Sequence, residues 1–306
     1  MYKKFYGLTE NPFNVNPDPR FLFVTEHIQE ALACLHYGVE HRKGFVLLTG
    51  EVGTGKTTLL NKLLESLRQQ GIASAFIFNS RLNTIQFFDF MLADFGLPTE
   101  PRVKSQMLMR LNQWLLERYQ AGGTTVLIVD EAQNLPVDVL EEVRLLTNLE
   151  TASEKLLQIV LSGQPELERK LGQPQFRQLR QRITLRSKTY PLSAEETPRY
   201  IAQRLRVAGW DGRPIFSPEA VETIHRFSHG IPRVINLLAE HALISGFADQ
   251  KAVIGPDIVM GLAKEFELDM IGPVVSSGQA PWQDGAPRGQ ASPQAGIVTS
   301  KLRRSH

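Results

Sequence analysis

One eight-residue stretch of the chain has the residue types and spacing of a phosphate-binding loop. Gly50 to Thr57 fits the pattern Gly-x-x-x-x-Gly-Lys-Ser/Thr. Its glycines let the backbone wrap around phosphate oxygens, which successive N–H groups at a helix N-terminus then bind. We expect Lys56 to reach the β- and γ-phosphates of a nucleotide and the Thr57 hydroxyl to bind Mg²⁺. The predicted nucleotide-binding residues are Gly50, Glu51, Val52, Gly53, Thr54, Gly55, Lys56, Thr57, Thr58 and Asp130.

Two adjacent carboxylates follow a second apolar run, Val126 to Val129. We expect Asp130 to hold Mg²⁺ through its water shell and Glu131 to orient or deprotonate the attacking water. Neighbouring residues of an extended segment point in different directions, which suits two separate roles. An acidic pair after a strand is commonly a solvated loop, so the catalytic interpretation depends on the phosphate loop.

A polar residue just after the apolar run that ends at Leu161 would face the γ-phosphate. Gln164 is the first candidate and Ser162 the second. Either residue could equally form only the turn before a helix that begins at Pro165.

An arginine-rich stretch, Arg177 to Ile183, allows three interpretations. It is a solvated helix face, a source of an arginine finger for a neighbouring subunit's γ-phosphate, or a surface for nucleic-acid phosphates. Arg182 ends the predicted helix, just before the strand-like residues 183–185, and is favoured over Arg180 as the finger.

Short apolar runs alternate with helix-type apolar spacing over the first 190 residues. Strands are predicted at 45–49, 73–78, 126–129 and 157–161, and helices at 56–69, 83–95, 104–119 and 137–149. Continuous apolar runs are typical of strands buried on both faces of a parallel sheet. The sequence therefore predicts a doubly wound α/β domain with a parallel sheet.

After Pro191 the pattern is purely helical. Predicted helices begin at the capping box Ser193–Glu196, at Ser217-Pro218, at Pro232 and at Pro256. They form a small all-helical second domain. Arg233 lies at the start of one helix, where its side chain could fold over bound phosphates and report their loss after hydrolysis.

Composition excludes several classes of protein. The 306 residues include 42% hydrophobic and 22% charged residues, which excludes collagen-like, coiled-coil and wholly disordered chains. The lone Cys34 excludes an internal disulfide framework and a multi-cysteine metal site. The net charge of the chain is +2, and the Pro/Gly/Ser-rich segment from Pro273 onward carries +3. The rest of the chain, residues 1–272, which we call the body, therefore carries −1. A nearly neutral body gives no global electrostatic case for nucleic-acid binding.

No signal peptide or apolar run of about 18 residues is present, so a cytoplasmic protein without direct membrane insertion is expected.

Together these motifs resemble the AAA+ ATPases, and further blocks resemble one family among them. The blocks include Asn11-Pro12-Phe13, residues 17–23, residues 145–151, Gly163-Gln164-Pro165-Glu166-Leu167, residues 177–183 and Gly230-Ile231-Pro232-Arg233. They are similar to the ExeA-type family, the general secretion pathway protein A ATPases, which also includes the mannose-sensitive hemagglutinin pilus biogenesis ATPase.

The resemblance implies an oligomeric ATPase that uses ATP and Mg²⁺ to drive assembly of a secretion or pilus machine of the cell envelope. Longer family members continue into a transmembrane segment and a periplasmic peptidoglycan-binding domain, whereas this sequence is expected to end in a polar tail. A separate membrane-embedded partner is therefore expected, with the chain cytoplasmic or peripheral at the inner membrane. The predicted domains are an N-terminal linker at 1–24, an ATPase core at 25–190, a helical lid at 191–270 and a disordered tail at 271–306.

Three points stay open in this interpretation. In such ATPases the linker commonly lies against the adenine, but Asn16, Pro17 and the aromatic residues at 21–23 could equally serve packing alone. The chain also resembles DNA-binding regulators of transposition target selection, which would use residues 177–188 as a DNA stripe. A scaffold that binds nucleotide without hydrolysis is disfavoured by the complete set Lys56, Thr57, Asp130 and Glu131.

Overall fold

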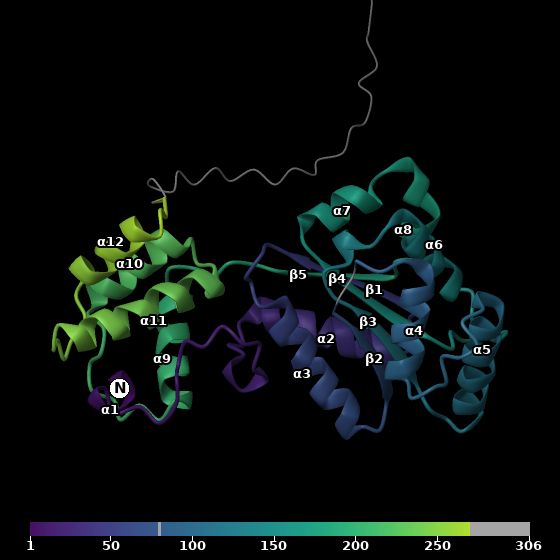
Figure 1. The fold of residues 1–306 in the computed structure, drawn as a ribbon, viewed down its shortest axis with the longest axis horizontal. Coiled ribbons are helices and arrows are strands. Elements are labelled where there is room, and N and C mark those ends of the chain that lie inside the picture. The colour runs from purple at the N-terminus through teal and green to yellow at the C-terminus, as the bar shows by residue number, and fades with distance from the viewer. Residues whose placement is uncertain (79–80, 270–306) are drawn as a thin grey trace, which may run out of the picture. The chain divides into compact units, whose positions relative to one another are not determined.

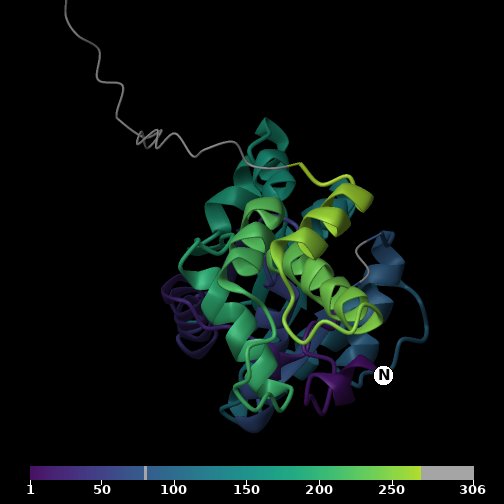
Figure 2. The same ribbon diagram turned by 90° about the vertical axis from the view of Figure 1, so that its left-hand side faces the viewer.

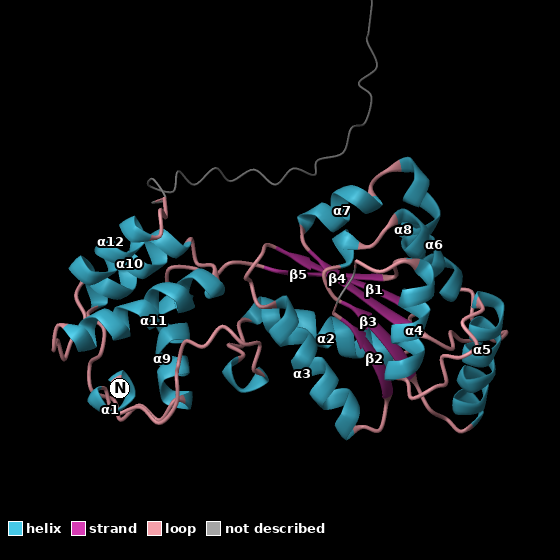
Figure 3. Ribbon diagram, in the orientation of Figure 1, coloured by secondary structure: helices cyan, strands magenta, loops and turns pink. Residues whose placement is uncertain are grey.

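The computed structural model describes residues 1–78 and 81–269, and the predicted tail lies outside the described residues. The described residues belong to one compact unit, Met1–Ile271. The α/β part of this unit is built around a five-stranded parallel sheet, with strand order β2-β3-β4-β1-β5 (Figures 1 and 3). The strands are β1 (Phe45–Gly50), β2 (Ala73–Ile77), β3 (Thr125–Val129), β4 (Gln158–Gly163) and β5 (Leu185–Thr189).

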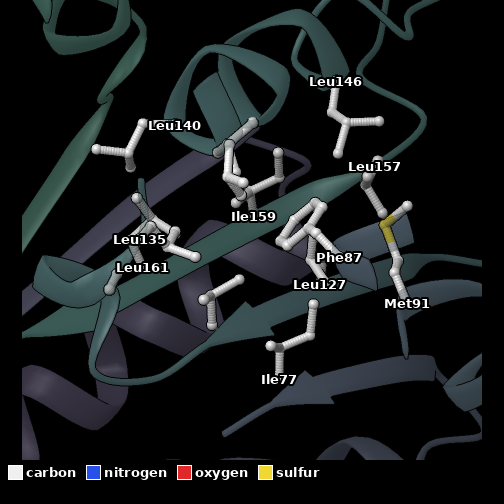
Figure 4. Close-up of a cluster of buried hydrophobic side chains, with 14 of the residues drawn as sticks. Ile77, Phe87, Met91, Leu127, Leu135, Leu140, Leu146, Leu157, Ile159 and Leu161 are labelled. Atoms are coloured by element: carbon white, nitrogen blue, oxygen red, sulfur yellow. The ribbon is translucent and has the colours of Figure 1, made fainter. Parts of the chain in front are cut away.

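Helices cover both faces of the sheet because each buried strand presents alternate side chains to opposite faces. On one face, Val46 and Val160 pack with α2 (Glu26–Glu40) and α3 (Lys56–Gln69). On the other face, Leu47 and Ile159 pack with the remaining helices of the α/β part. These helices are α4 (Thr84–Asp94), α5 (Lys104–Gln120), α6 (Val137–Leu146), α7 (Pro165–Leu171) and α8 (Arg177–Arg182). Figure 4 shows this second cluster around Leu127 and Phe87. The predicted doubly wound fold is confirmed.

The fifth strand extends beyond what the sequence indicated. Residues 183–185 looked strand-like, but β5 begins only at Leu185 and continues to Thr189. Its side chains alternate between half-buried or buried and exposed, with Arg186 and Lys188 pointing to solvent. An edge strand with charged residues lacks the continuous apolar run of the central strands, so the sequence indicates its bounds only weakly.

Four helices pack around a hydrophobic core of their own, separate from the cores on the two faces of the sheet. We call these four helices the lid. They are α9 (Glu196–Val207), α10 (Pro218–Ser228), α11 (Pro232–Ala248) and α12 (Pro256–Glu265). The predicted capping box before α9 is present: the Glu196 N–H donates to Ser193 Oγ at 3.1 Å, and the Ser193 N–H donates to Glu196 Oε2 at 2.8 Å. The helix predicted at 137–149 ends three residues early, at Leu146.

The N-terminal segment packs into the lid before it reaches the sheet domain. After the short helix α1 (Tyr2–Phe5), the side chains of Tyr6, Leu8 and Phe13 are buried in the lid core. Figure 2 shows this purple segment beside the green and yellow helices of the lid. The segment then crosses to the sheet domain, where Asn61 of α3 donates a hydrogen bond to the Pro17 carbonyl at 2.8 Å. It therefore contacts both parts of the molecule.

The turn between the lid helices α10 and α11 requires glycine at position 230. Gly230 has φ +72°, and a Cβ there would stand 1.9 Å from the carbonyl oxygen of Leu192. The same two residues are joined by a hydrogen bond from Leu192 N–H to Gly230 O at 2.8 Å. We expect Gly230→Ala to lower the free energy of unfolding by about 2–5 kcal/mol, because the new methyl group meets backbone that cannot rotate away.

Chemical denaturation of the wild type and two variants checks this prediction. Gly261→Ala is the matched control, since no atom lies within 4 Å of a Cβ at Gly261 in helix α12. Alanine is favoured over glycine in a helix interior by about 1 kcal/mol, so this control is expected to be at least as stable as the wild type. Equal stability of the two variants would contradict the proposed clash.

Candidate functional site

The phosphate-binding sequence forms the turn between β1 and α3, at the carboxyl end of a central strand. Gly53 and Gly55 have φ of +81° and +93°, which glycine adopts without strain. Gly55 precedes the first residue of α3, so the free N–H groups of the first helical turn face the same side as the loop. The local geometry is that of an anion-binding loop.

Lys56 is held inside this loop. Its side chain is 5% exposed, and its amine donates to the carbonyls of Gly50 and Glu51 at 2.8 and 2.9 Å. Burial lowers the pKa of Lys56, although the nearby carboxylates of Glu131 and Asp130 act in the opposite direction. The amine therefore lies at the centre of the loop, where phosphate oxygens would replace its backbone partners.

The residues predicted to hold Mg²⁺ lie together. Thr57 Oγ1 donates to Asp130 Oδ2 at 2.6 Å, and Asp130 Oδ1 accepts the Glu131 N–H at 2.9 Å. Asp130 is only 3% exposed, directly after β3. A hydroxyl and a carboxylate that converge on one point supply the oxygen ligands that Mg²⁺ prefers, so these residues fit the ion.

Glu131 adopts a left-handed backbone conformation, with φ 52° and ψ 36°. For a residue other than glycine this is an uncommon conformation that is concentrated at functional sites. Two side-chain amides donate to its Oε2 atom: Gln133 Nε2 at 2.5 Å and Gln164 Nε2 at 2.9 Å. The Gln133 Oε1 atom in turn accepts the backbone N–H of Gln164 at 3.2 Å. The Glu131 carboxylate is thus fixed by neighbours from two loops.

The two candidates for the polar residue near the γ-phosphate lie in different surroundings. Gln164 reaches the catalytic candidate Glu131, as described above. Ser162 is fully buried in β4, opposite Leu48 of β1, and its Oγ has no hydrogen-bond partner. Of the two candidates, Gln164 is the one that hydrogen-bonds to another predicted site residue, Glu131.

A cavity of about 360 Å³ adjoins the phosphate loop. Its walls come from the loop at residues 52–58, the N-terminal segment, the connection 190–192 and the lid helices α9 and α11. Phe21, Leu22 and Phe23 line it, as do Asn16 and Pro17. The volume is within the range of small-molecule sites, and the mixture of apolar wall and polar loop suits a ligand with an apolar ring and anionic groups.

Arg233 lines the cavity from the first turn of α11. Its backbone N–H donates to the Gly53 carbonyl at 3.2 Å. A Cβ at Gly53 would stand 2.7 Å from Arg233 Cβ, so the lid helix begins directly against the phosphate loop. The exposed Arg233 side chain is therefore beside the predicted phosphate position.

The arginines at 177, 180 and 182 lie elsewhere, and none of them lines the cavity. Arg182 is exposed, and its Nη2 donates to Asn148 Oδ1 at 3.2 Å. Two residues later, the Thr184 N–H donates to the Phe45 carbonyl, where β1 begins. Arg182 thus lies near the amino ends of the strands, whereas the phosphate loop lies at their carboxyl ends. The structure does not bring Arg182 to the site of its own chain.

Sequence reasoning missed several side chains of the site. Gln133, Tyr200, Arg204 and Asn236 were not singled out, although the first contacts Glu131 and the other three line the cavity. The signal for Asn236 was present, since it follows Arg233 by three residues on a predicted helix and must share its face. Gln133 had a weaker signal, as a polar residue two positions after the acidic pair.

The sequence is similar to those of known proteins that have this type of domain. A family model described as an AAA domain matches residues 39–171. The chain is 48% identical over 249 residues to the general secretion pathway protein A of Aeromonas hydrophila. The chain is a relative of the ExeA-type AAA+ ATPases. The match covers 81% of this chain but 45% of the relative, so the chain spans less than half of that protein.

Solved structures of more distant proteins share the fold. The Aeropyrum pernix ORC2 protein is 17% identical, with a TM-score of 0.63 over 86% of this chain and 73% of that one. Cdc6p from Pyrobaculum aerophilum is 16% identical, with a TM-score of 0.65 over 84% and 71%. The Thermotoga maritima RuvB branch migration motor is 18% identical, with a TM-score of 0.54 over 79% and 69%. At these identities the likeness concerns the fold alone.

Within residues 1–78 and 81–269, no helix has the length and apolar character needed to cross a membrane.

Proposed function

We propose that the chain hydrolyses ATP with Mg²⁺ and works as an oligomer that drives assembly of a secretion or pilus machine of the cell envelope. The main support for this proposal is that Lys56, the Thr57–Asp130 pair and Glu131 converge beside one cavity. The family relationship supports the same activity, and the name of the Aeromonas relative supports the secretion role.

In the proposed mechanism, the phosphates of ATP lie on the N–H groups of residues 53–57, and Lys56 exchanges its carbonyl partners for phosphate oxygens. Thr57 and Asp130 would hold Mg²⁺, which would offset the negative charge that develops on the transferring phosphate. Glu131 accepts a proton from the attacking water. Gln164, whose amide donates to Glu131 at 2.9 Å, keeps that carboxylate aligned and is close to the position of the γ-phosphate.

The proposed oligomer explains why the arginines lie far from their own cavity. An exposed Arg182 can enter the nucleotide site only of a neighbouring subunit, where it would stabilise the charge on the transferring phosphate. Arg233 of the lid would contact the phosphates within its own subunit. The lid at 191–270 would then change position with the state of the nucleotide. We place the oligomer in the cytoplasm, peripheral at the inner membrane through a membrane-embedded partner.

A second candidate function is DNA binding by an AAA+ regulator of transposition target selection. Exposed arginines at positions 177, 180, 182 and 186 favour it, and the Drosophila ORC, which has a similar fold, has been solved bound to DNA. The nearly neutral body disfavours it, as does the pairing of Lys188 with Glu168 at 3.0 Å. The secretion role therefore stays first.

Steady-state ATP hydrolysis, measured against protein concentration with and without duplex DNA, tests the proposal. We expect specific activity to rise with concentration, to ignore DNA and to disappear in Lys56→Ala, which should also bind ATP at least about tenfold more weakly. Turnover that DNA stimulates, with a steep dependence on salt, would favour the second candidate. Unchanged hydrolysis in Lys56→Ala would contradict the assignment of the site.

A further inference from the structure

Three buried polar side chains of the lid form a hydrogen-bonded chain along the cavity wall. Tyr200 and Arg204 of α9 and Asn236 of α11 are only 4%, 6% and 6% exposed, and all three line the cavity. Arg204 Nη1 donates to the Tyr200 hydroxyl at 3.0 Å, and that hydroxyl donates to Asn236 Oδ1 at 2.8 Å. Arg204 also donates to the Pro12 and Asn14 carbonyls of the N-terminal segment at 2.5 and 3.0 Å.

These hydrogen bonds from Arg204 to Tyr200 and from Tyr200 to Asn236 fix the orientation of the Asn236 amide. Arginine can only donate, so the Tyr200 hydroxyl must accept from Arg204 and direct its own proton to Asn236. Burial raises the pKa of Tyr200, which keeps that proton on the hydroxyl. Asn236 therefore presents its oxygen to Tyr200 and its Nδ2 group elsewhere.

The orientation of the Asn236 amide leaves its Nδ2 group for a ligand in the cavity. Among the described residues, Asn236 contacts the protein through its Oδ1 atom, which accepts from the Tyr200 hydroxyl. Asn236 itself lines the cavity. Its two N–H bonds are thus donors that a ligand in the cavity can use.

The surroundings of Asn236 suit a flat apolar ring. The Arg204 guanidinium lies 4.6 Å from the centre of the Phe21 ring, and the Phe23 ring packs edge-on against Tyr200 at 5.8 Å. On α11, Asn236 lies one turn beyond Arg233, about 4.5 Å further along the helix axis and on the same face. One helix therefore carries a cation beside the phosphate loop and an amide donor beside the aromatic wall.

We propose that Asn236 is a specificity-determining residue that donates a hydrogen bond to a ring nitrogen of a bound purine. The proposal rests on the nucleotide site proposed above and adds how the base is held. Purine ring nitrogens accept hydrogen bonds, and a donor oriented by Tyr200 and Arg204 loses little freedom when it meets one. Because Asn236 and Arg233 share a helix, a bound base also sets the position of Arg233 over the phosphates.

Binding of two probes separates the base from the phosphates: ATP and inorganic tripolyphosphate. Asn236→Asp keeps the shape and the acceptor for Tyr200 but replaces the donor with a second oxygen. We expect its ATP affinity to fall about tenfold or more relative to its tripolyphosphate affinity. The added negative charge repels both probes, so the ratio of the two affinities isolates the contact with the base. Tyr200→Phe, which frees the amide to rotate, should lower the same ratio by a smaller factor.

Asn112→Asp on α5, which does not line the cavity, is the matched control and should leave both affinities unchanged. In the wild type, one of 1-deaza-, 3-deaza- and 7-deaza-ATP should bind more weakly than ATP, and that difference should vanish in Asn236→Asp. An unchanged ratio in Asn236→Asp, or equal binding of ATP and all three analogues to the wild type, would overturn the inference. Unchanged binding of both probes by Lys56→Ala would instead overturn the nucleotide site itself.

Discussion

Glu131→Gln is expected to lower kcat for ATP hydrolysis by about 100- to 10,000-fold while ATP binding stays within about twofold. The substitution preserves the size of the side chain but removes the group that accepts a proton from water. Lys56 and the Thr57–Asp130 pair, which bind the phosphates in our proposal, are untouched. The loss should therefore appear in the chemical step and not in affinity.

The contacts of Glu131 make this a sharp test. Its Oε2 atom accepts from Gln133 and Gln164, and a glutamine at position 131 can still accept through its own amide oxygen. The local structure should persist, which equal melting temperatures of the variant and wild type would verify. Glu65→Gln is the matched control, because Glu65 is an exposed residue of α3 that pairs with Lys62 in a surface ion pair. Full turnover in Glu131→Gln would instead favour a base elsewhere in the site.

The phosphate loop could be predicted from the sequence because its function depends on local backbone geometry. Residues such as Gly53 and Gly55 adopt positive φ, and the Lys-Thr pair follows at fixed spacing, so eight consecutive residues contain the whole motif. The same reasoning applies to the central strands, whose burial on both faces leaves continuous apolar runs.

The remaining parts of the site depend on long-range packing that no local pattern encodes. Gln133 reaches Glu131 because the backbone turns into the left-handed region at Glu131 and because Gly163 leaves room: a Cβ there would stand 2.7 Å from Gln133 Oε1. Asn236 is oriented by Tyr200 through the packing of α11 on α9. The N-terminal segment was predicted as a linker, yet Tyr6 and Phe13 belong to the lid core, about 200 positions away in sequence.

Arg182→Ala is expected to reduce ATP turnover by about 1,000- to 100,000-fold, the range observed for arginine fingers, with little change in ATP affinity. The reason is its position: Arg182 is exposed at the sheet edge opposite its own phosphate loop, beside Asn148. It can act on phosphate only in another subunit. Arg177→Ala on the first turn of the same helix is the matched control and should retain most of the activity.

Mixing variants distinguishes a finger supplied between subunits from a structural role. Arg182→Ala subunits retain Glu131, and Glu131→Gln subunits retain Arg182, so a mixed oligomer contains some interfaces at which both residues are intact. Two inactive variants should therefore recover part of the wild-type activity when combined, and the recovery should depend on total concentration because it needs association. If the mixture stays inactive although it assembles, Arg182 acts within its own subunit. If Arg182→Ala alone hydrolyses ATP at the wild-type rate, the exposed arginines serve another surface, and the DNA-dependent activity becomes the better account of them.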